Sequence, residues 1–420
     1  MEQTDNSPTG IFKRYGALTR NVLALSLVSL LNDTSSEIIY PLLPAFLALT
    51  LGASPFAIGL IEGFAESVAS LLKLFSGYLS DKFERRKLPV FLGYSLAALT
   101  RPFLAFVTSW PQVLVVRVTD RVGKGIRGAP RDALIADSVP REKRGLAFGF
   151  NRAADHTGAV IGPIIAFILL SYLSADPQNP TAREFQRVFL YASIPVVLGL
   201  FVIVAFVREE KKHVPATNGN PIKFSIKAFD WNFQKFLIVI AIFTLSNSTD
   251  AFLLLRAEQS GISPAHLPLL WMALHFSKVF FSLIGGHWSD RIGRKKLIFA
   301  GWIIYAAVYG GFAFVTTAWQ AWTLFIIYGA YFGMTEGVEK ALVADMVDED
   351  KRGTAFGFYN LAFGITVLPA SLLFGELWDN FGASTAFLFS AGISIIAALL
   401  FLTVKPARDQ IPSSESQVPG

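Results

Sequence analysis

The stretch GYLSDKFERRKL, at residues 77–88, decides the fold because it recurs in the second half of the chain as GHWSDRIGRKKL, at residues 286–297. Two further matches fall in the same order at nearly the same offset, roughly 209 residues. They pair GASP at 52–55 with GISP at 261–264, and ALIADSVPREKRGLAFGF at 133–150 with ALVADMVDEDKRGTAFGF at 341–358. Three ordered matches at nearly one spacing predict two parallel structural repeats.

The composition is that of an integral membrane protein. Of the 420 residues, 53% are hydrophobic and only 16% are charged, and the mean hydropathy is +0.48. Apolar runs of about 20 residues, the length that a helix needs to cross a bilayer, recur from residue 22 to residue 404. Runs such as FLIVIAIFTL, at 236–245, lack the alternation of membrane strands. We therefore predict an all-α integral membrane protein.

Twelve transmembrane helices are expected, in two pseudo-symmetric six-helix halves. The predicted spans are residues 21–48, 55–80, 88–109, 111–138, 143–172, 186–207, 233–257, 264–290, 296–316, 319–346, 353–378 and 382–404. The longest polar connection has Pro, Asn and Gly at its centre and falls midway along the chain. The predicted parts are a tail (1–20), a first bundle (21–207), a linker (208–232), a second bundle (233–404) and a second tail (405–420).

The net charge of +6 comes from short clusters of Lys and Arg between the apolar runs. These clusters fall in connections that share one side, whereas the opposite connections carry little beyond Arg183 and Arg187. The positive-inside bias explains this pattern better than nucleic-acid binding does. We expect a multi-pass inner (plasma) membrane protein with both termini cytoplasmic and no cleaved signal peptide. The chain has no Cys, which excludes disulfides and thiolate metal sites.

The repeated loop resembles the signature of the major facilitator superfamily between spans two and three. The first copy supplies Gly77, Asp81, Lys82, Arg85 and Arg86, with Glu84 where the family has glycine. The second copy supplies Gly286, Asp290, Arg291, Gly293, Arg294 and Lys295. The resemblance covers essentially the whole chain, and it implies the twelve-helix fold of that family and a transport function.

The loop residues suggest a cytoplasmic gate. An aspartate at the end of one span can accept hydrogen bonds from arginine and from backbone N–H groups at a neighbouring helix start. We expect such contacts of Asp81 and Asp290 to latch the two halves together. For Lys87 and Lys296, enforcement of topology alone is an equal alternative.

Several spans carry charges, which are costly in a bilayer unless they face a cavity or pair with each other. Helical spacing places Asp33 and Glu37 on one face of span one, and Glu62 and Glu66 on one face of span two with Lys73. In span four a stripe of four cations is only partly neutralised by Asp120 and Asp132; it consists of Arg117, Arg121, Lys124 and Arg131. The excess charge of this stripe is positive.

Arg121 and Gly125 resemble a fourth-span motif that the superfamily associates with proton coupling, although Lys124 replaces its glutamine. The resemblance implies that Arg121 faces the central cavity and acts on a carboxylate, Asp33 or Glu37 being the leading candidates. An arginine nearby stabilises the ionised carboxylate, whereas burial opposes ionisation, so their competition can create a proton site. A permanent ion pair that only orients two helices is the alternative.

Span five carries Arg152, Asp155 and His156 at helical spacing, a trio that can relay protons unless Arg152 lies at the cytoplasmic interface. The small residues Gly158 and Gly162 favour close helix packing. With Pro163 they partly resemble the glycine-proline motif of drug–proton antiporters, except that Ala166 replaces one glycine. In the second half the candidates are fewer: Asp250, Arg256, Glu258, His275, Lys278, Glu336, Glu339 and Lys340. Internally neutralised packing is an equal alternative for Glu336.

We predict a proton-coupled secondary transporter that moves a small polar or ionic solute by alternating access. Export by antiport is expected from the span-five motif, and import of an anionic metabolite by proton symport is the alternative. A membrane sensor with the same fold is a further alternative. Neither HExxH nor GxSxG occurs, which argues against an enzyme. The expected partners are the solute, protons and the lipid bilayer, with no nucleic acid, no cofactor and no metal, and the expected state is a monomer.

Overall fold

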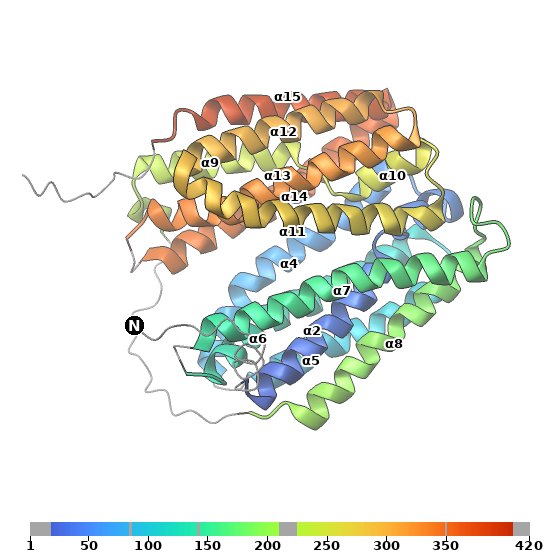
Figure 1. Ribbon diagram of the computed structural model, residues 1–420, viewed down its shortest axis with the longest axis horizontal. Helices are drawn as coiled ribbons and strands as arrows, with labels where there is room; N and C mark the ends of the chain where they lie inside the picture. Colours follow the sequence, from blue (N-terminus) through green and yellow to red (C-terminus); the bar gives the residue numbers. More distant parts are fainter. Residues whose placement is uncertain (1–17, 84–85, 141–142, 210–224, 349–350, 406–420) are drawn as a thin grey trace, which may run out of the picture.

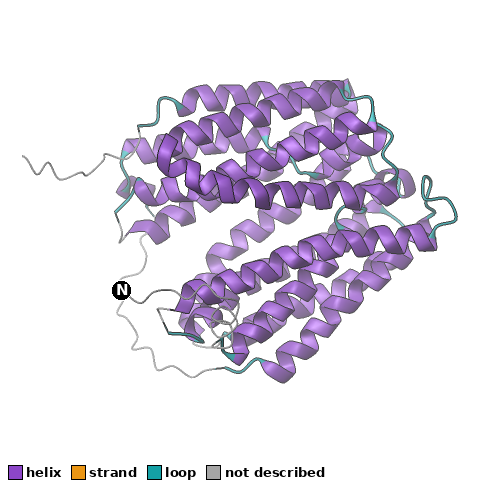
Figure 2. Ribbon diagram, in the orientation of Figure 1, coloured by secondary structure: helices purple, strands orange, loops and turns teal. Residues whose placement is uncertain are grey.

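The computed structural model describes residues 18–83, 86–140, 143–209, 225–348 and 351–405, and within these ranges the regular elements are all helices (Figure 2). The first half contains α2 (Arg20–Ile39), α3 (Leu43–Ala45), α4 (Pro55–Phe83), α5 (Lys87–Thr100), α6 (Trp110–Asp137), α7 (Arg144–Leu173) and α8 (Ala182–Phe206). The second half contains α9 (Trp231–Ser246), α10 (Ala251–Gln259), α11 (Leu267–Ile292), α12 (Arg294–Phe314), α13 (Ala318–Asp345), α14 (Arg352–Phe381) and α15 (Ala383–Phe401). With α2–α3 and α9–α10 each making one span, the prediction of twelve spans is confirmed for the described residues.

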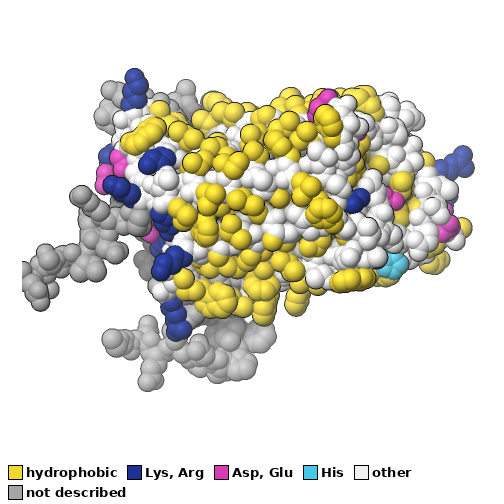
Figure 3. Space-filling view, turned by 90° about the horizontal axis from the view of Figure 1, so that it is seen from above, with side chains coloured by type: hydrophobic (Ala, Val, Ile, Leu, Met, Phe, Trp, Pro, Cys, Tyr) yellow, Lys and Arg dark blue, Asp and Glu magenta, His cyan; other side chains and the backbone are white. Residues whose placement is uncertain are grey.

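Nine stretches of the described residues are long and apolar enough to cross a membrane. The helices α6 and α13 do not reach that apolarity, although each is 28 residues long. In α6 the reason is the charged stripe that faces inward. In Figure 3 apolar side chains cover the middle of the molecule, and most Lys and Arg in view lie at one end. The chain is therefore a multi-pass membrane protein.

Local polar contacts set where several spans begin. Thr181 and Glu184 form a reciprocal capping box at the start of α8, and Thr317 and Gln320 form another at the start of α13. Asp230 caps α9 by accepting a hydrogen bond from the backbone nitrogen of Phe233 at 2.9 Å. Such caps satisfy backbone N–H groups that have no partner inside the helix. They explain why α8 begins at residue 182, four residues before the predicted span.

The seventh span is not the continuous helix that the apolar pattern predicts for residues 233–257. α9 ends at Ser246 and α10 begins at Ala251, so residues 247–250 interrupt the span. Their sequence is NSTD, and the hydroxyl of Thr249 accepts a hydrogen bond from the backbone nitrogen of Ala251 at 3.3 Å. Short polar side chains compete with helical hydrogen bonds in this way. An irregular backbone at membrane depth is tolerated where it lines a cavity, and this one does.

The helices form two bundles, one from α2 to α8 and one from α9 to α15 (Figure 1). In each bundle the helices of one half pack mainly on one another, for example α2 on α7 and α8, and α12 on α13 and α15. The main contacts between the bundles join α4 to α14 and α7 to α11. We call the end that carries Arg86, Lys87, Arg294 and Lys295 the basic end, and the other the opposite end.

The bundles converge at the opposite end. There the backbone nitrogen of Phe56, in α4, donates to Asp379 of α14 at 2.9 Å. Deeper along the same pair, Ser67 donates its hydroxyl proton to the carbonyl of Gly364 at 2.6 Å. In Figure 1 the two bundles approach each other on the right and separate toward the left. These hydrogen bonds join the two bundles at the opposite end.

Candidate functional site

A cavity of about 1230 Å³ lies between the two bundles. Its walls come from α2, α4, α6 and α7 on one side, and from the α9–α10 break, α11, α13 and α14 on the other. Tyr40 and Trp271 line its deep end, and Ser289 and Arg294 line it toward the basic end. The cavity is therefore shared by both halves and is open to one side.

All ten cavity residues predicted from the sequence line this space. They are Asp33, Glu37, Glu62, Glu66, Arg121, Lys124, Asp155, His156, Asp250 and Glu336. Eleven Lys and Arg residues and eight Asp and Glu residues contribute to the lining. Helical spacing identified which side of each helix faces the cavity, because charged residues that recur every three or four positions share one side of a helix.

Glycines bring α7 close to α2, which positions two of these acids. A Cβ atom at Gly158 would lie 2.7 Å from the carbonyl oxygen of Leu30 and 3.0 Å from the Cβ of Asp33. A Cβ at Gly162 would lie 2.7 Å from the Cβ of Glu37. The two helices therefore touch backbone to backbone where Asp33 and Glu37 project. This is the close packing that small residues permit in membrane helices.

Glu37 connects the two halves at the deep end of the cavity. The indole nitrogen of Trp271, in α11, donates to Oε2 of Glu37 at 2.6 Å, and Nε2 of His275 lies 3.8 Å from the same oxygen. Tyr40 packs on Trp271 with ring centroids 4.9 Å apart. A carboxylate of α2 is thus hydrogen-bonded to one side chain of the other bundle and lies near a second. Sequence reasoning did not find Trp271, because an indole in an apolar run carries no charge signal.

A buried ion pair joins α4 to α6. Nε and Nη2 of Arg117 donate to the two carboxylate oxygens of Glu62 at 2.8 and 2.6 Å. Their side chains are 6% and 2% exposed. This bidentate geometry satisfies both groups where water is excluded. Glu62 therefore has a partner that occupies it fully.

A second buried network centres on Arg101, which sequence reasoning missed. Arg101 lies in the short 3-10 turn Arg101–Ala105 and donates to Asp120 at 3.1 Å. It also donates to the backbone carbonyl and the side-chain oxygen of Asn32, at 2.9 and 3.0 Å. Its signal in the sequence is a lone arginine inside the apolar third span, which requires a partner at that depth. The network ties α2, α5 and α6 together.

The partner of Arg121 differs from the prediction. Nη2 of Arg121 lies 3.1 Å from a carboxylate oxygen of Glu66, in α4. The predicted partners have other contacts, because Glu37 is held by α11 and Asp33 accepts a hydrogen bond from the side chain of Asn32 at 2.9 Å. The spacing along one helix gives a face but does not say which neighbouring helix supplies the partner. Arg121 therefore pairs with span two, and not with span one.

The second half places Asp250 beside Lys278. The two side chains are 3.9 Å apart, and the hydroxyl of Tyr328 donates to Asp250 at 2.8 Å. Lys278 also lies 3.7 Å from the centre of the Phe332 ring, a cation–π contact. Asp250 directly precedes α10 at the break in span seven. The broken span thus brings a carboxylate and irregular backbone to the cavity wall.

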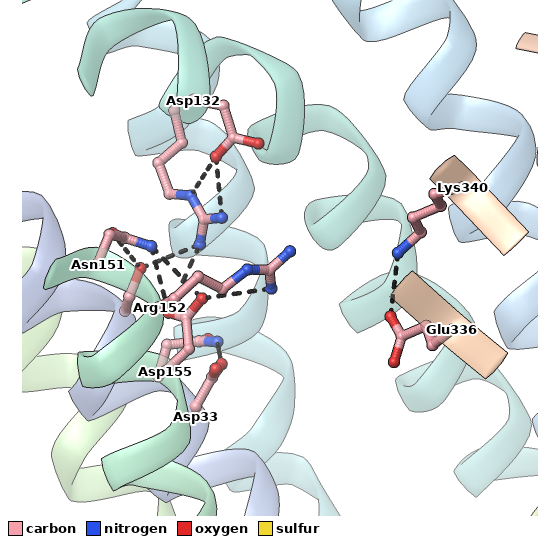
Figure 4. A network of polar contacts seen from close by, with 10 residues as sticks. Asp33, Asp132, Asn151, Arg152, Asp155, Glu336 and Lys340 are labelled. Carbon is pink, nitrogen blue, oxygen red and sulfur yellow. Dashed lines mark hydrogen bonds and ion pairs between the residues drawn. The ribbon is translucent and has the colours of Figure 1, made fainter. Parts of the chain in front are cut away.

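The predicted trio of span five lines the cavity, and Figure 4 shows the contacts of Arg152 and Asp155. Asp155 is 3.9 Å from Arg152 and 4.0 Å from Arg131, whereas the side chain of Arg152 is 70% exposed. His156 is exposed and makes no hydrogen bond or ion pair within the described ranges. On the other wall Glu336 pairs with Lys340 at 3.0 Å. The contacts therefore connect Asp155 to Arg131 and Arg152, and do not include His156.

The predicted gate residues are described in part. Gly77, Asp81, Arg85, Gly286 and Asp290 lie outside the residues whose side chains the structure describes. Arg291, in the last turn of α11, is exposed, and Gly293 has a φ of 96°, which glycine adopts without strain. This conformation separates α11 from α12.

Arg86 and Arg294 make equivalent contacts at equivalent places in the two repeats. Arg86 pairs with Asp137 and donates to the carbonyl of Ala133, and Arg294 pairs with Asp345 and donates to the carbonyl of Ala341. Each arginine thereby joins the end of one span to the end of another in its own bundle. These contacts join spans within each bundle at the basic end, whereas the latch predicted for Asp81 and Asp290 lies outside the described side chains.

The described residues contain no group of three His, Asp or Glu side chains arranged to hold a metal ion. The charged lining of the cavity offers ion pairing and hydrogen bonding. Its acids and bases come from both bundles, and the cavity is open to one side. Such an arrangement can bind a polar solute, exchange protons with it and release it elsewhere when the bundles rearrange.

Comparisons with known proteins agree with this geometry. The sequence profile described as Major Facilitator Superfamily matches residues 25–277 and 236–419. The chain is 34% identical over 396 residues to an uncharacterized MFS-type transporter of Methanocaldococcus jannaschii, covering 92% of this chain and 95% of that protein. It is 25% identical over 386 residues to the fosmidomycin resistance protein of Escherichia coli, covering 90% of each. The crystal structure of a mutant nucleoside transporter superposes with a TM-score of 0.79 at 15% identity, covering 91% of this chain and 99% of that one, which shows a shared fold.

Proposed function

The chain belongs to the major facilitator superfamily of membrane transporters, and on that premise we propose that it is a proton-coupled secondary transporter that moves a small polar or ionic solute by alternating access. The observation that carries the proposal is the contact of Glu37 with Trp271 and His275 across the two bundles. It places a titratable group at the contact that must break when the cavity opens to the other side.

Protonation of Glu37 changes the strength of this contact. An ionised carboxylate accepts a hydrogen bond from an indole N–H more strongly than a neutral carboxyl group does. A proton on Glu37 therefore weakens the hold of α2 on α11 and favours separation at the opposite end. Asp33, one turn away on the same helix, is the second proposed proton acceptor. Arg121 and Lys124 are the proposed cavity cations.

The proposed motion is a rocking of two halves, residues 21–207 and 233–404, joined by the linker 208–232. The contact between α4 and α14 and that between α7 and α11 are the surfaces on which the halves would turn. We propose that the basic end faces the cytoplasm of the cell in its inner membrane, that the transporter is a monomer, and that this structure represents the inward-open state.

Export by antiport with protons is the proposed direction. The partial glycine-proline motif of span five and the likeness to a fosmidomycin resistance protein support it. The second candidate is proton symport of an anionic solute, which the excess of Lys and Arg in the cavity lining supports. The two candidates predict opposite directions of proton movement. In antiport a solute gradient drives protons the opposite way, and in symport it drives them the same way.

Reconstitution tests the proposal. Solutes that stabilise the purified protein against heat, chosen from drugs, organic anions, sugars and amino acids, are added to proteoliposomes containing a pH-sensitive dye. We expect at least one of them to move protons, and Glu37→Gln together with Asp33→Asn to abolish that movement while solute binding remains. Full coupling in the double variant would overturn the assignment of these acids. Binding without flux in the wild type would favour a membrane sensor over a transporter.

A further inference from the structure

Three cations and one carboxylate meet on the first-half wall of the cavity. Glu66 and Lys73 project from α4, and Arg121 and Lys124 project from α6. Arg121 contacts Glu66 at 3.1 Å. The side chains of Lys73 and Lys124 form no ion pair and no hydrogen bond within the described ranges, although both are among the charged groups that act most strongly on Glu66. We call these four residues the α4–α6 cluster.

The neighbouring arginines of the same bundle are already saturated. Arg117 binds both oxygens of Glu62, and Arg101 binds Asp120 and Asn32. Arg131 binds Asp132 through two nitrogens and Ser29 through a third. The excess positive charge of this wall is therefore not spread evenly. It is concentrated in the α4–α6 cluster and on Arg127, which forms no ion pair within the described ranges and lies over the Tyr94 ring.

Arg121 itself has an unused donor. Its Nε is buried and has no hydrogen-bond partner among the described residues, although Nη2, on the same edge of the guanidinium, lies 3.1 Å from Glu66. A buried donor without a partner is unfavourable, and a ligand oxygen would satisfy it. Guanidinium groups bind carboxylate and phosphate oxygens through two parallel N–H groups. The geometry of the donor matches an anionic group.

We propose that the α4–α6 cluster binds the anionic group, a carboxylate or a phosphate, of the transported solute. This inference rests on the proposed transport function and names its substrate class. The anionic group displaces Glu66 from the Nε/Nη2 edge of Arg121, and Lys124 and Lys73 supply the charge that Glu66 alone does not balance. Glu66 competes with the ligand for Arg121, so removal of its charge strengthens anion binding.

Two glycines permit a direct test that does not require the natural solute. Gly128 lies one turn beyond Lys124 on α6 and lines the cavity, and a Cβ added there meets no atom within 4 Å. Gly337 on α13 also lines the cavity with no atom within 4 Å, but beside the mutually neutralised pair of Glu336 and Lys340. Because the chain has no Cys, Gly128→Cys and Gly337→Cys each create one unique thiol at matched sites.

Each variant, in detergent, is labelled with a methanethiosulfonate that carries either a sulfonate or a trimethylammonium group. The ratio of the two rates reports the local potential and cancels the intrinsic reactivity of the thiol. At Gly128→Cys we expect the anionic reagent to be favoured about tenfold relative to Gly337→Cys. Equal ratios at the two sites would overturn the proposal.

Charge-removing substitutions then assign the effect to the cluster. In the Gly128→Cys background, Lys124→Gln or Lys73→Gln lowers the ratio several-fold, and Glu66→Gln raises it. Lys235→Gln, on α9 and outside the cavity lining, is the control and leaves the ratio unchanged. If neither Lys124→Gln nor Lys73→Gln changes the ratio of labelling rates, the local potential has another source and the proposed site is wrong.

Two small anions test whether the cluster binds an anion and distinguish a carboxylate site from a phosphate site. Acetate and inorganic phosphate are added at matched ionic strength, with chloride as the reference for screening. If acetate slows labelling more than chloride does, the site binds carboxylates. If phosphate slows labelling more than chloride does, the site binds phosphates. Protection by neither overturns the proposal. Because no flux is measured, these results stand apart from the proteoliposome assay, and failure of one is distinguishable from failure of the other.

Discussion

The indole nitrogen of Trp271 lies 2.6 Å from Oε2 of Glu37, so one hydrogen bond joins α11 of the second bundle to α2 of the first. It sits at the deep end of the cavity, beside the aromatic contact of Tyr40 with Trp271. The cavity narrows at this point because the two bundles touch there. The bond is therefore a reporter of the closed state of the opposite end.

Trp271→Phe removes the donor and keeps an aromatic ring. We expect the opposite end to open more often, because the carboxylate of Glu37 loses its strongest hold on α11. In Gly128→Cys proteoliposomes, labelling by a membrane-impermeant thiol reagent from the side of the opposite end should rise several-fold. Trp319→Phe is the control, since the Trp319 side chain is 67% exposed at the start of α13. An unchanged rate for Trp271→Phe would show that the bond does not restrain opening.

Glu62→Gln leaves the guanidinium of Arg117 buried without a charged partner. Removal of one member of a buried ion pair costs about 3–5 kcal/mol, because the remaining charge is uncompensated. The variant should therefore unfold at clearly lower denaturant concentration in detergent. The double variant Glu62→Met, Arg117→Met should recover most of the loss. Arg152→Met, at a site 70% exposed, is expected to change the free energy of unfolding by less than about 0.5 kcal/mol.

Gly162→Ala should force α7 away from α2. The added Cβ would lie 2.7 Å from the Cβ of Glu37 and 2.8 Å from the carbonyl oxygen of Thr34. Overpacking of this kind costs about 1–3 kcal/mol, measured as a loss of thermal stability. Gly149→Ala on the same helix is the matched control, because its Cβ meets no atom within 4 Å. It should be neutral or stabilising by up to about 1 kcal/mol, since alanine favours helix.

The two equivalent pairs at the basic end should differ in strength. The side chains of Arg86 and Asp137 are 19% and 24% exposed, whereas those of Arg294 and Asp345 are 30% and 41% exposed. Solvent screens the second pair more. Double-mutant cycles with alanine should therefore give a larger coupling energy for the first pair. Added salt should lower the coupling energy of the second pair more than that of the first. Equal coupling at all salt concentrations would contradict this.

Much of the fold is encoded locally. Apolar runs of sufficient length are helices in a bilayer because each backbone polar group must find its partner within the segment. Caps such as Thr181 and Glu184 refine the boundaries, and the NSTD stretch at 247–250 is a local signal for the break in span seven. The prediction followed apolarity alone, so it treated residues 233–257 as one continuous helix. For the same reason it placed the start of α8 four residues too late.

The sequence by itself determined the membrane class, the repeat, the twelve spans and the faces on which the charges lie. The tertiary structure decided which charges meet: Arg121 with Glu66, Glu37 with Trp271, and Arg101 with Asp120. The reason is physical. The face of a helix follows from 3.6 residues per turn within one segment, whereas a partner depends on how separate helices pack and rotate. An ion pair between spans therefore has no signature in the spacing of either span.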